Sequence, residues 1–257
     1  MLKLLKKCQD LIISLLLGAL ILFLWQAGKI HELLSLKPYQ LPLPDEILKT
    51  FRENADVIRD NTFWTLREAL LGILIGSLIG FAVAVFAAAF PKIGIGGISI
   101  VTAVNAIPMI AMASIMNNWF GMATASKAAV VAVFSMAAMA LNAFRGMTDL
   151  PEFSRELMQI CAARRMTVFF KLQLPNSIPY VLTALKISTT TGLMAAICSE
   201  FFTSYKGIGY KLTSSIKLSQ MSMAWSYILV ATLCGVLMYA VLSVVERVLL
   251  KWHASQR

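Results

Sequence analysis

The stretch EFSRELMQICAARRMTVFFKLQLP, from Glu152 to Pro175, is the most highly charged segment in the second half of the chain. Long apolar runs lie on both sides of it, and each is long enough to span a membrane. A charged segment between two spans has to lie outside the bilayer, and its excess of Arg and Lys predicts the cytoplasmic side. Leu157, Ile160 and Cys161 recur at helical spacing. We therefore expect a short amphipathic helix whose apolar face needs a partner from outside this chain.

The composition is that of an integral membrane protein. Of the 257 residues, 58% are hydrophobic and 14% are charged, whereas a soluble domain has about 25% charged residues. The mean hydropathy is +0.74. The net charge of +10 would suggest nucleic-acid binding in a soluble protein. Here the basic residues flank apolar runs, so we interpret them as setting the orientation in the membrane.

The sequence contains no recognisable motif for ATP binding, metal binding or catalysis. It contains no Gly-x-x-x-x-Gly-Lys-Ser/Thr loop, so ATP cannot bind by that route. The four cysteines are scattered without a C-x-x-C pair, and neither histidine has a ligand partner nearby. The sequence therefore predicts a non-catalytic chain without a metal site or disulfide.

The apolar runs predict an all-α protein with six transmembrane helices and both termini inside. The expected spans are residues 11–27, 69–91, 98–115, 128–144, 175–199 and 225–245. No cleavage site follows the first run, so we interpret it as a retained span. The expected organisation is a tail and first span (1–27), an extracytoplasmic segment (28–62), a permease-like core (63–250) with a cytoplasmic loop (147–176), and a cytoplasmic tail (251–257). A turn at Gly94, Gly96 and Gly97 is expected before the third span.

Small residues and a proline mark special places in the spans. Gly72, Gly76 and Gly80 recur every four residues, a spacing that lets another helix approach closely, although scattered glycines are the alternative. Pro108 is expected to break the third helix, which frees backbone polar groups that need protein or water.

Polar residues in the spans are candidates for lining a path. We assign that role to Asn105, Pro108, Met112 and Asn142, with ordinary packing as the alternative. The hydroxyls of residues 188–191 are expected to bond to their own helix, and Lys186 is expected to extend to the cytoplasmic surface. The sequence shows no charge pair within the spans and no unpaired cation at the centre of the membrane.

The frame of the charged stretch resembles the cytoplasmic loop of ABC-importer membrane subunits. That motif begins E-A-A, has a Gly six residues after the Glu, and closes with Leu-Pro. Glu156 and Leu174-Pro175 match, while Ala162 stands in the place of the Gly. Since Ala is disfavoured in the left-handed region, we expect no left-handed residue at 162. A generic amphipathic connector is the alternative interpretation.

Two further motifs resemble the nitrate/sulfonate/taurine branch of these permeases, and the resemblance covers roughly residues 40 to 250. They are Ala-Ile-Pro at 106–108 followed by Trp-Phe-Gly at 119–121, and Glu200 followed by Gly-Ile-Gly-Tyr at 207–210. The resemblance implies a type I ABC importer permease fold in the bacterial inner membrane. The ATPase-coupling residues would be Glu156, Leu157, Ile160, Cys161, Ala162, Arg164 and Arg165, and the outer-loop residues would be Glu200, Gly207 and Gly209.

The resemblance also implies partners. They are a second copy of this chain, two separate ATPase subunits that bind ATP and Mg²⁺, and an extracytoplasmic substrate-binding protein. This chain would then have no cofactor of its own. The solute would be a small anion such as nitrate or a sulfonate, or a heterocycle such as a pyrimidine precursor or riboflavin. The lack of a free buried cation favours a neutral or heterocyclic solute.

A stand-alone secondary transporter or channel is the alternative function. Inverted repeats and intramembrane charge pairs would support it, and the sequence shows neither.

Overall fold

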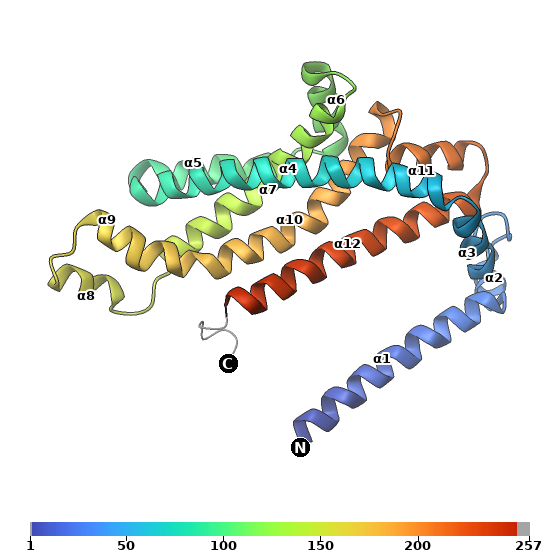
Figure 1. Cartoon of the computed structure of the whole chain (residues 1–257), viewed down its shortest axis with the longest axis horizontal. Helices are drawn as coiled ribbons and strands as arrows, with labels where there is room; N and C mark the ends of the chain where they lie inside the picture. The colour runs from blue at the N-terminus through green and yellow to red at the C-terminus, as the bar shows by residue number, and fades with distance from the viewer. Residues whose placement is uncertain (1, 251–257) are drawn as a thin grey trace. The chain divides into compact units, whose positions relative to one another are not determined.

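The computed structural model describes residues 2–250, except for the side chains of residues 2–11, 15, 91 and 203. This part of the chain is helical and contains no strand, which confirms the expected all-α fold (Figure 1). The α-helices are α1 Leu2–Gln26, α2 Lys29–Leu34, α3 Pro44–Glu53, α4 Ala55–Ala89, α5 Pro91–Ala103, α6 Met109–Phe120, α7 Thr124–Thr148, α8 Ser154–Ile160, α9 Arg165–Val168, α10 Leu174–Thr203, α11 Ile208–Lys217 and α12 Met221–Leu249. A 3₁₀ turn covers Val104–Ala106, and a π-helical turn covers Phe169–Gln173. The predicted tail, 251–257, lies outside the described residues.

Four segments of the described chain are long and apolar enough to cross a membrane: Ala55–Ala89, Thr124–Thr148, Arg165–Phe202 and Met221–Leu249. Lys92–Ala106 and Met109–Phe120 pass the same test only together, as a helix pair bent by 100° at a short break. The bend falls at Ile107 and Pro108, so the predicted break at the proline is confirmed. In α1, residues Ile12–Gln26 form a shorter apolar helix. The total of six spans therefore stays a prediction.

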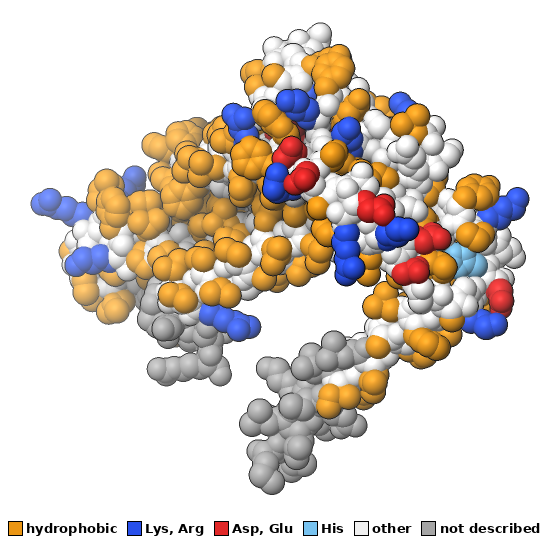
Figure 2. Space-filling model, turned by 45° about the vertical axis from the view of Figure 1, so that its right-hand side comes forward, with side chains coloured by type: hydrophobic (Ala, Val, Ile, Leu, Met, Phe, Trp, Pro, Cys, Tyr) orange, Lys and Arg blue, Asp and Glu red, His pale blue; other side chains and the backbone are white. Residues whose placement is uncertain are grey.

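Large apolar side chains remain exposed along the spans. Leu74 and Leu78 of α4 are 58% and 64% exposed, and Val236 of α12 is 60% exposed. Figure 2 shows hydrophobic side chains over much of the visible face. Apolar surface on this scale is uncommon on soluble proteins, whereas lipid chains cover it in a bilayer.

The glycine repeat of α4 packs directly against the backbone of α7. A Cβ on Gly76 would lie 2.2 Å from the Ala132 carbonyl oxygen, and a Cβ on Gly80 would lie 2.3 Å from the Met136 carbonyl oxygen. Gly72 meets Val131 in the same way, with its Cβ position 2.4 Å from that side chain. The predicted close helix approach is confirmed, because no larger residue fits at these three positions.

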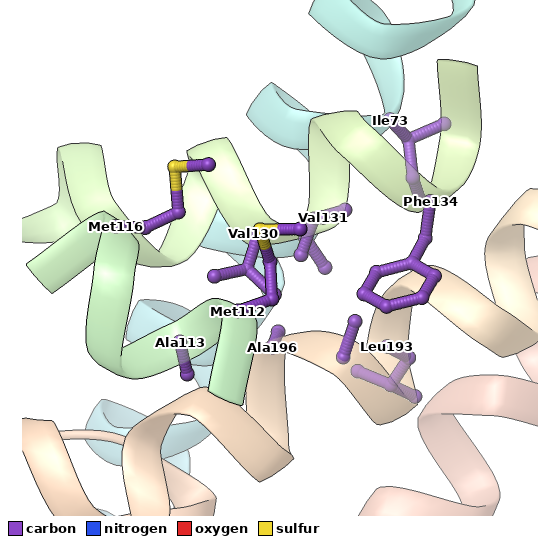
Figure 3. Close-up of a cluster of buried hydrophobic side chains, with 11 residues drawn as sticks. Ile73, Met112, Ala113, Met116, Val130, Val131, Phe134, Leu193 and Ala196 are labelled. Atoms are coloured by element: carbon purple, nitrogen blue, oxygen red, sulfur yellow. The ribbon is translucent and has the colours of Figure 1, made fainter. Parts of the chain in front are cut away.

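A hydrophobic cluster joins α4, α6, α7 and α10. Met112 and Met116 of α6 belong to it, and Figure 3 shows Met112 close to Val130 of α7, and Leu193 of α10 beside Phe134 of α7. Each of these side chains is buried. The break at Pro108 therefore does not release α6, because its methionines fill the core beside α7.

One local expectation from the sequence is wrong. The predicted turn at Gly94, Gly96 and Gly97 is part of α5, which begins at Pro91 directly after α4. α4 begins at Ala55, so the expected span at 69–91 forms the apolar part of a longer helix. Hydropathy marks the apolar stretch, while helical backbone bonding continues through the flanking residues.

Contacts divide the chain into two units. The first contains Met1–Arg59 and Lys211–Leu229, and the second contains Asp60–Tyr210 and Val230–Arg257. In the first unit, the rings of Trp25 and Trp225 meet edge-on with centroids 5.7 Å apart, and the Ser226 hydroxyl donates to the Ile47 carbonyl at 3.1 Å. The second unit contains the core and the residues considered below.

We expect Gly76→Val to lower the stability of the purified protein by about 1–3 kcal/mol, because the side chain would force α4 and α7 apart. The thermal midpoint in detergent micelles measures this. Gly96→Val is the matched control, since nothing lies within 4 Å of a Cβ at Gly96 of α5. Equal effects of the two substitutions would contradict the packing interpretation.

Candidate functional site

The connection between α7 and α10, residues 149–173, carries the predicted ATPase-coupling residues. In Figure 1, α8 and α9 lie beyond the ends of α7 and α10. The predicted residues of this connection are all exposed: Glu156, Leu157, Ile160, Cys161, Ala162, Arg164 and Arg165. The side chains of Leu157 and Ile160 are 61% and 82% exposed. The structure thus brings these residues to one accessible segment with an uncovered apolar side.

Phe153 is a member of this surface that the sequence analysis missed. It precedes α8 in a left-handed conformation with φ of 61° and is 68% exposed. Leu157 and Ile160 follow within α8 at the i, i+3 spacing of one helix face, and Phe153 lies just before that helix. We call these three residues the α8 apolar face. The aromatic residue four positions before Leu157 was the available signal.

Ala162 contradicts the expectation that residue 162 is not left-handed. Its φ is +47°, directly after the end of α8. The Ala162 N–H donates to the Gln159 carbonyl at 2.9 Å, and the Ala163 N–H donates to the Met158 carbonyl at 3.0 Å. These two bonds form a Schellman motif, which normally has glycine at the left-handed position. The hydrogen bonds hold Ala162 in a conformation that Ala alone disfavours.

The base of the connection is held by α10. The Asn176 side-chain amide donates to the carbonyls of Gly146 and Asp149 at 2.8 and 2.9 Å. The Tyr180 hydroxyl donates to the Asp149 carboxylate at 3.0 Å. Gly146 allows this contact, since a Cβ there would lie 2.7 Å from the Ser177 Cα. The start of α10 and the end of α7 are therefore fixed to one another.

At the opposite end of α10, a buried carboxylate organises the α10–α11 loop. Glu200 has no exposed surface and accepts hydrogen bonds from the Thr65 hydroxyl at 2.7 Å and the Gly209 N–H at 2.6 Å. The Ile208 N–H donates to Thr65 Oγ1 at 2.8 Å, and the Gly207 N–H donates to Asn61 Oδ1 at 3.0 Å. Three successive backbone N–H groups at the start of α11 thus bind side chains of α4 and α10.

Both glycines of this loop are required by their surroundings. Gly207 has φ of +102°, and a Cβ there would lie 2.2 Å from Glu200 Oε1. A Cβ on Gly209 would lie 2.2 Å from the Ile197 carbonyl oxygen. The predicted outer-loop residues Glu200, Gly207 and Gly209 therefore come together in one site, with the carboxylate occupying the space that side chains would need.

A second carboxylate and a lysine adjoin Glu200. Glu68 is 5% exposed and Lys127 is 1% exposed, and both interact electrostatically with Glu200. The Lys127 ammonium donates to the Met122 carbonyl at 3.1 Å and to the Ser126 hydroxyl at 3.3 Å. The sequence analysis missed this grouping. The signal was the i, i+4, i+7 spacing of Asn61, Thr65 and Glu68 before the uncharged part of α4.

Lys186, expected to extend to the cytoplasmic surface, has a charged partner in α12. Its ammonium pairs with the Glu246 carboxylate of α12 at 2.5 Å, and both side chains are largely buried. It also lies 5.7 Å from the centre of the Tyr239 ring. This pair corrects the expectation that the spans contain no charge pair. Its two residues are 60 positions apart in the sequence and belong to different helices.

The predicted path residues do not share one surface in this conformation. Asn105 and Pro108 lie together at the α5–α6 break and are exposed. Met112 is 6% exposed and packs inward against α7. Asn142 donates its amide to the Ala138 carbonyl of its own helix at 2.8 Å. A path role for Met112 therefore requires a state in which α6 separates from α7.

Three buried serines lie on the helices of the α4–α7–α10 contact. A Cβ on Gly192 of α10 would lie 2.9 Å from Ile73 and 3.1 Å from Val131. One helical turn from these residues, on the same helices, are Ser77, Ser135 and Ser188. Their hydroxyls are buried and have no hydrogen-bond partner among the described residues. The threonines at 189–191 differ, since each bonds to a carbonyl of its own helix as expected.

No group of three or more His, Cys, Asp or Glu side chains that could hold a metal ion occurs within the described residues.

We expect Ala162→Gly to stabilise the end of α8 by about 1 kcal/mol, because glycine adopts the left-handed conformation without a Cβ penalty. Hydrogen exchange of the 162 and 163 amides measures this as about fivefold greater protection. Ala163→Gly is the control, since Ala163 has no positive φ, and it should reduce protection. Unchanged exchange in Ala162→Gly would argue against the strain.

Glu200→Gln should loosen the α10–α11 loop by about 1–3 kcal/mol, because one of the two donors to the carboxylate would then face an NH₂ group. Faster hydrogen exchange of residues 207–209 measures the effect. Glu53→Gln, at an exposed position of α3, should leave this exchange unchanged. Wild-type protection in Glu200→Gln would show that the carboxylate does not hold the loop.

Named transport permeases are similar in sequence to this protein over most of its length. The chain is 24% identical over 221 residues to the formylaminopyrimidine transport permease protein ThiX of Halalkalibacterium halodurans, covering 86% of this chain and 88% of the relative. It is 24% identical over 246 residues to the putative aliphatic sulfonates transport permease protein SsuC of Bacillus subtilis, covering 94% and 88%. Among solved structures, the inward-facing MetNI methionine ABC transporter shares the fold with a TM-score of 0.66 at 16% identity, covering 75% of this chain and 95% of that chain.

The family comparison covers the core described above. The model of the binding-protein-dependent transport system inner membrane component matches residues 72–255, which include α5 to α12 and the α7–α10 connection. Since this match spans most of the chain, the protein belongs to that family, as an ABC importer permease subunit of the nitrate/sulfonate/taurine branch.

Proposed function

We propose that this chain acts as a homodimer with two ABC ATPase subunits and an extracytoplasmic substrate-binding protein, and that the dimer forms the path for a small solute. Family membership supports a non-catalytic, multi-pass permease of the bacterial inner membrane, whose ATPase is a separate chain. ATP and Mg²⁺ would then bind to the ATPase, and this chain would have no cofactor of its own. A stand-alone secondary transporter has no comparable support.

The α8 apolar face carries this proposal. Phe153, Leu157 and Ile160 are 68%, 61% and 82% exposed on a segment that also carries charged residues. Large apolar side chains exposed to water mark a surface that another protein covers. A short amphipathic helix typically buries such a face in a groove of its partner. We therefore assign α8 to a groove of the ATPase, with Glu156 at its edge.

Movement of α8 would reach the spans through the base of the connection. Asn176 bonds the end of α7 through two carbonyls, and Tyr180 bonds Asp149. These contacts leave little freedom between α7 and α10. When ATP closes the ATPase subunits, a shift of α8 would therefore move the two helices rather than only the loop.

The basic residues support the proposed orientation of the chain. The α7–α10 connection carries Arg155, Arg164, Arg165 and Lys171 against fewer acidic residues. This excess supports a cytoplasmic location. The α10–α11 loop would then face the outside, and the predicted six spans would leave both termini in the cytoplasm.

The path would run beside the α5–α6 break. Asn105 and Pro108 are exposed there, and a broken helix leaves backbone polar groups that need water or protein. Both features favour a polar lining at this level. Met112 and Asn142 would join the lining only after the rearrangement of α6 or the release of the Asn142 amide.

The solute is proposed as small, with the binding protein making the main selection. The named relatives transport a formylaminopyrimidine in one case and, by the name, aliphatic sulfonates in the other. The buried lysines Lys127 and Lys186 lie beside carboxylates. Neither offers a free positive charge to an anion, which supports a neutral or heterocyclic solute.

Glu156→Lys tests the docking of α8. Glu156 is exposed and forms no ion pair within the described residues. If it meets a basic residue of the ATPase, reversal should weaken assembly by about 2–5 kcal/mol. Co-purification of the ATPase and solute-stimulated ATP hydrolysis measure the loss, while membrane insertion should be unchanged.

Glu152→Lys provides the matched control for this reversal. Glu152 is also exposed on the α7–α10 connection but lies before α8. It should retain both assembly and stimulation. If Glu156→Lys retains them as well, α8 is not the coupling element.

A further inference from the structure

Trp64 of α4 has two positive charges beside its indole ring. The Arg67 guanidinium carbon lies 5.4 Å from the ring centroid, and the Lys206 ammonium nitrogen lies 4.6 Å from it. Both distances fall within the range of about 6 Å for cation–π contacts. Arg67 belongs to α4 and Lys206 to the α10–α11 loop. Two segments far apart in the sequence thus bring their charges to one ring.

These two cations form no ion pair within the described residues, and both side chains are exposed. The Glu68 carboxylate interacts electrostatically with Arg67, but it is buried and also faces Glu200 and Lys127. Like charges held near one another repel. The arrangement therefore favours an anion from outside the chain.

Arg67 lies on the exposed apolar stripe of α4. Phe63, Leu70, Leu74 and Leu78 are 62%, 55%, 58% and 64% exposed. With Arg67 between the first two, the spacing is i, i+4, i+7, i+11 and i+15, which follows one side of a helix. The cation thus stands at the end of a surface whose leucines are suited to lipid chains.

Two exposed aromatic residues lie near the other cation, Lys206, in the sequence. Phe202 and Tyr205 are 66% and 72% exposed and lie close to Lys206 in the sequence. Tyr and Trp are enriched where a membrane meets water, because their rings tolerate both environments. The position of Trp64 and Tyr205 therefore indicates the headgroup level of the bilayer.

We propose that Arg67 and Lys206, held beside Trp64, bind the phosphate of an anionic phospholipid whose acyl chains lie along the exposed stripe of α4. A guanidinium matches a phosphate with two parallel hydrogen bonds, and the ammonium adds a second charge nearby. A soluble phosphate would offer the same headgroup chemistry. Only a lipid would also cover Leu70, Leu74 and Leu78, which is why the surface points to a lipid.

Native mass spectrometry of the assembled transporter tests this site. The complex is released from detergent after incubation with phosphatidylglycerol or with zwitterionic phosphatidylcholine. Wild type should retain phosphatidylglycerol in preference. In Arg67→Gln/Lys206→Gln, retention should weaken about fivefold for each charge removed. Lys37→Gln/Lys217→Gln is the matched control, since both lysines are exposed and the change in charge is the same.

The outcomes separate the possible ligands. If only the Arg67/Lys206 variant loses phosphatidylglycerol, the proposed site is supported. This measurement does not depend on transport or on the docking of α8. Equal retention in the two double variants would overturn the proposal. Inorganic phosphate at millimolar concentration is added in a second arm. If it displaces phosphatidylglycerol, the site binds a soluble oxyanion and the assignment to lipid is wrong.

Discussion

The second unit of the structure depends on the direct backbone contact between α4 and α7. Lipid gives helices little hydrophobic reason to associate, so they are held by close packing and polar contacts. Gly72, Gly76 and Gly80 provide the packing, because the α7 backbone occupies the space of their side chains. α10 completes the contact through Gly192, which meets Ile73 and Val131. The core cluster with α6 is built on this three-helix contact.

α10 links the two ends of that contact. At one end, Asn176 and Tyr180 bind the end of α7 and the base of the α7–α10 connection. At the other, Glu200 binds Thr65 of α4 and the first amides of α11. Between them, Lys186 pairs with Glu246 of α12. A displacement of α10 would therefore affect polar contacts at both of its ends.

Much of the fold could be predicted because single residues with strong local effects marked it. Pro108 lacks a backbone donor, and the helix breaks there. Ala162 shows the limit of this reasoning. Local preference argued against a left-handed residue, yet the two bonds that close α8 impose one. The glycines at 94–97 likewise suggested a turn, but α5 runs through them, since Gly94 fits against Ala87 of α4.

The sequence by itself determined the membrane class, the order of the apolar segments, the helix break and the exposed loop frame around Glu156. Each follows from hydropathy or from one residue's backbone preference, which act locally. Only the tertiary structure decided which charged and polar side chains meet. Glu200 bonds to Thr65, 135 positions away, and Lys186 pairs with Glu246, 60 positions away. Lys206 and Arg67 both lie near the Trp64 ring. Such pairs depend on helix register and rotation in three dimensions, and hydropathy contains no information on either.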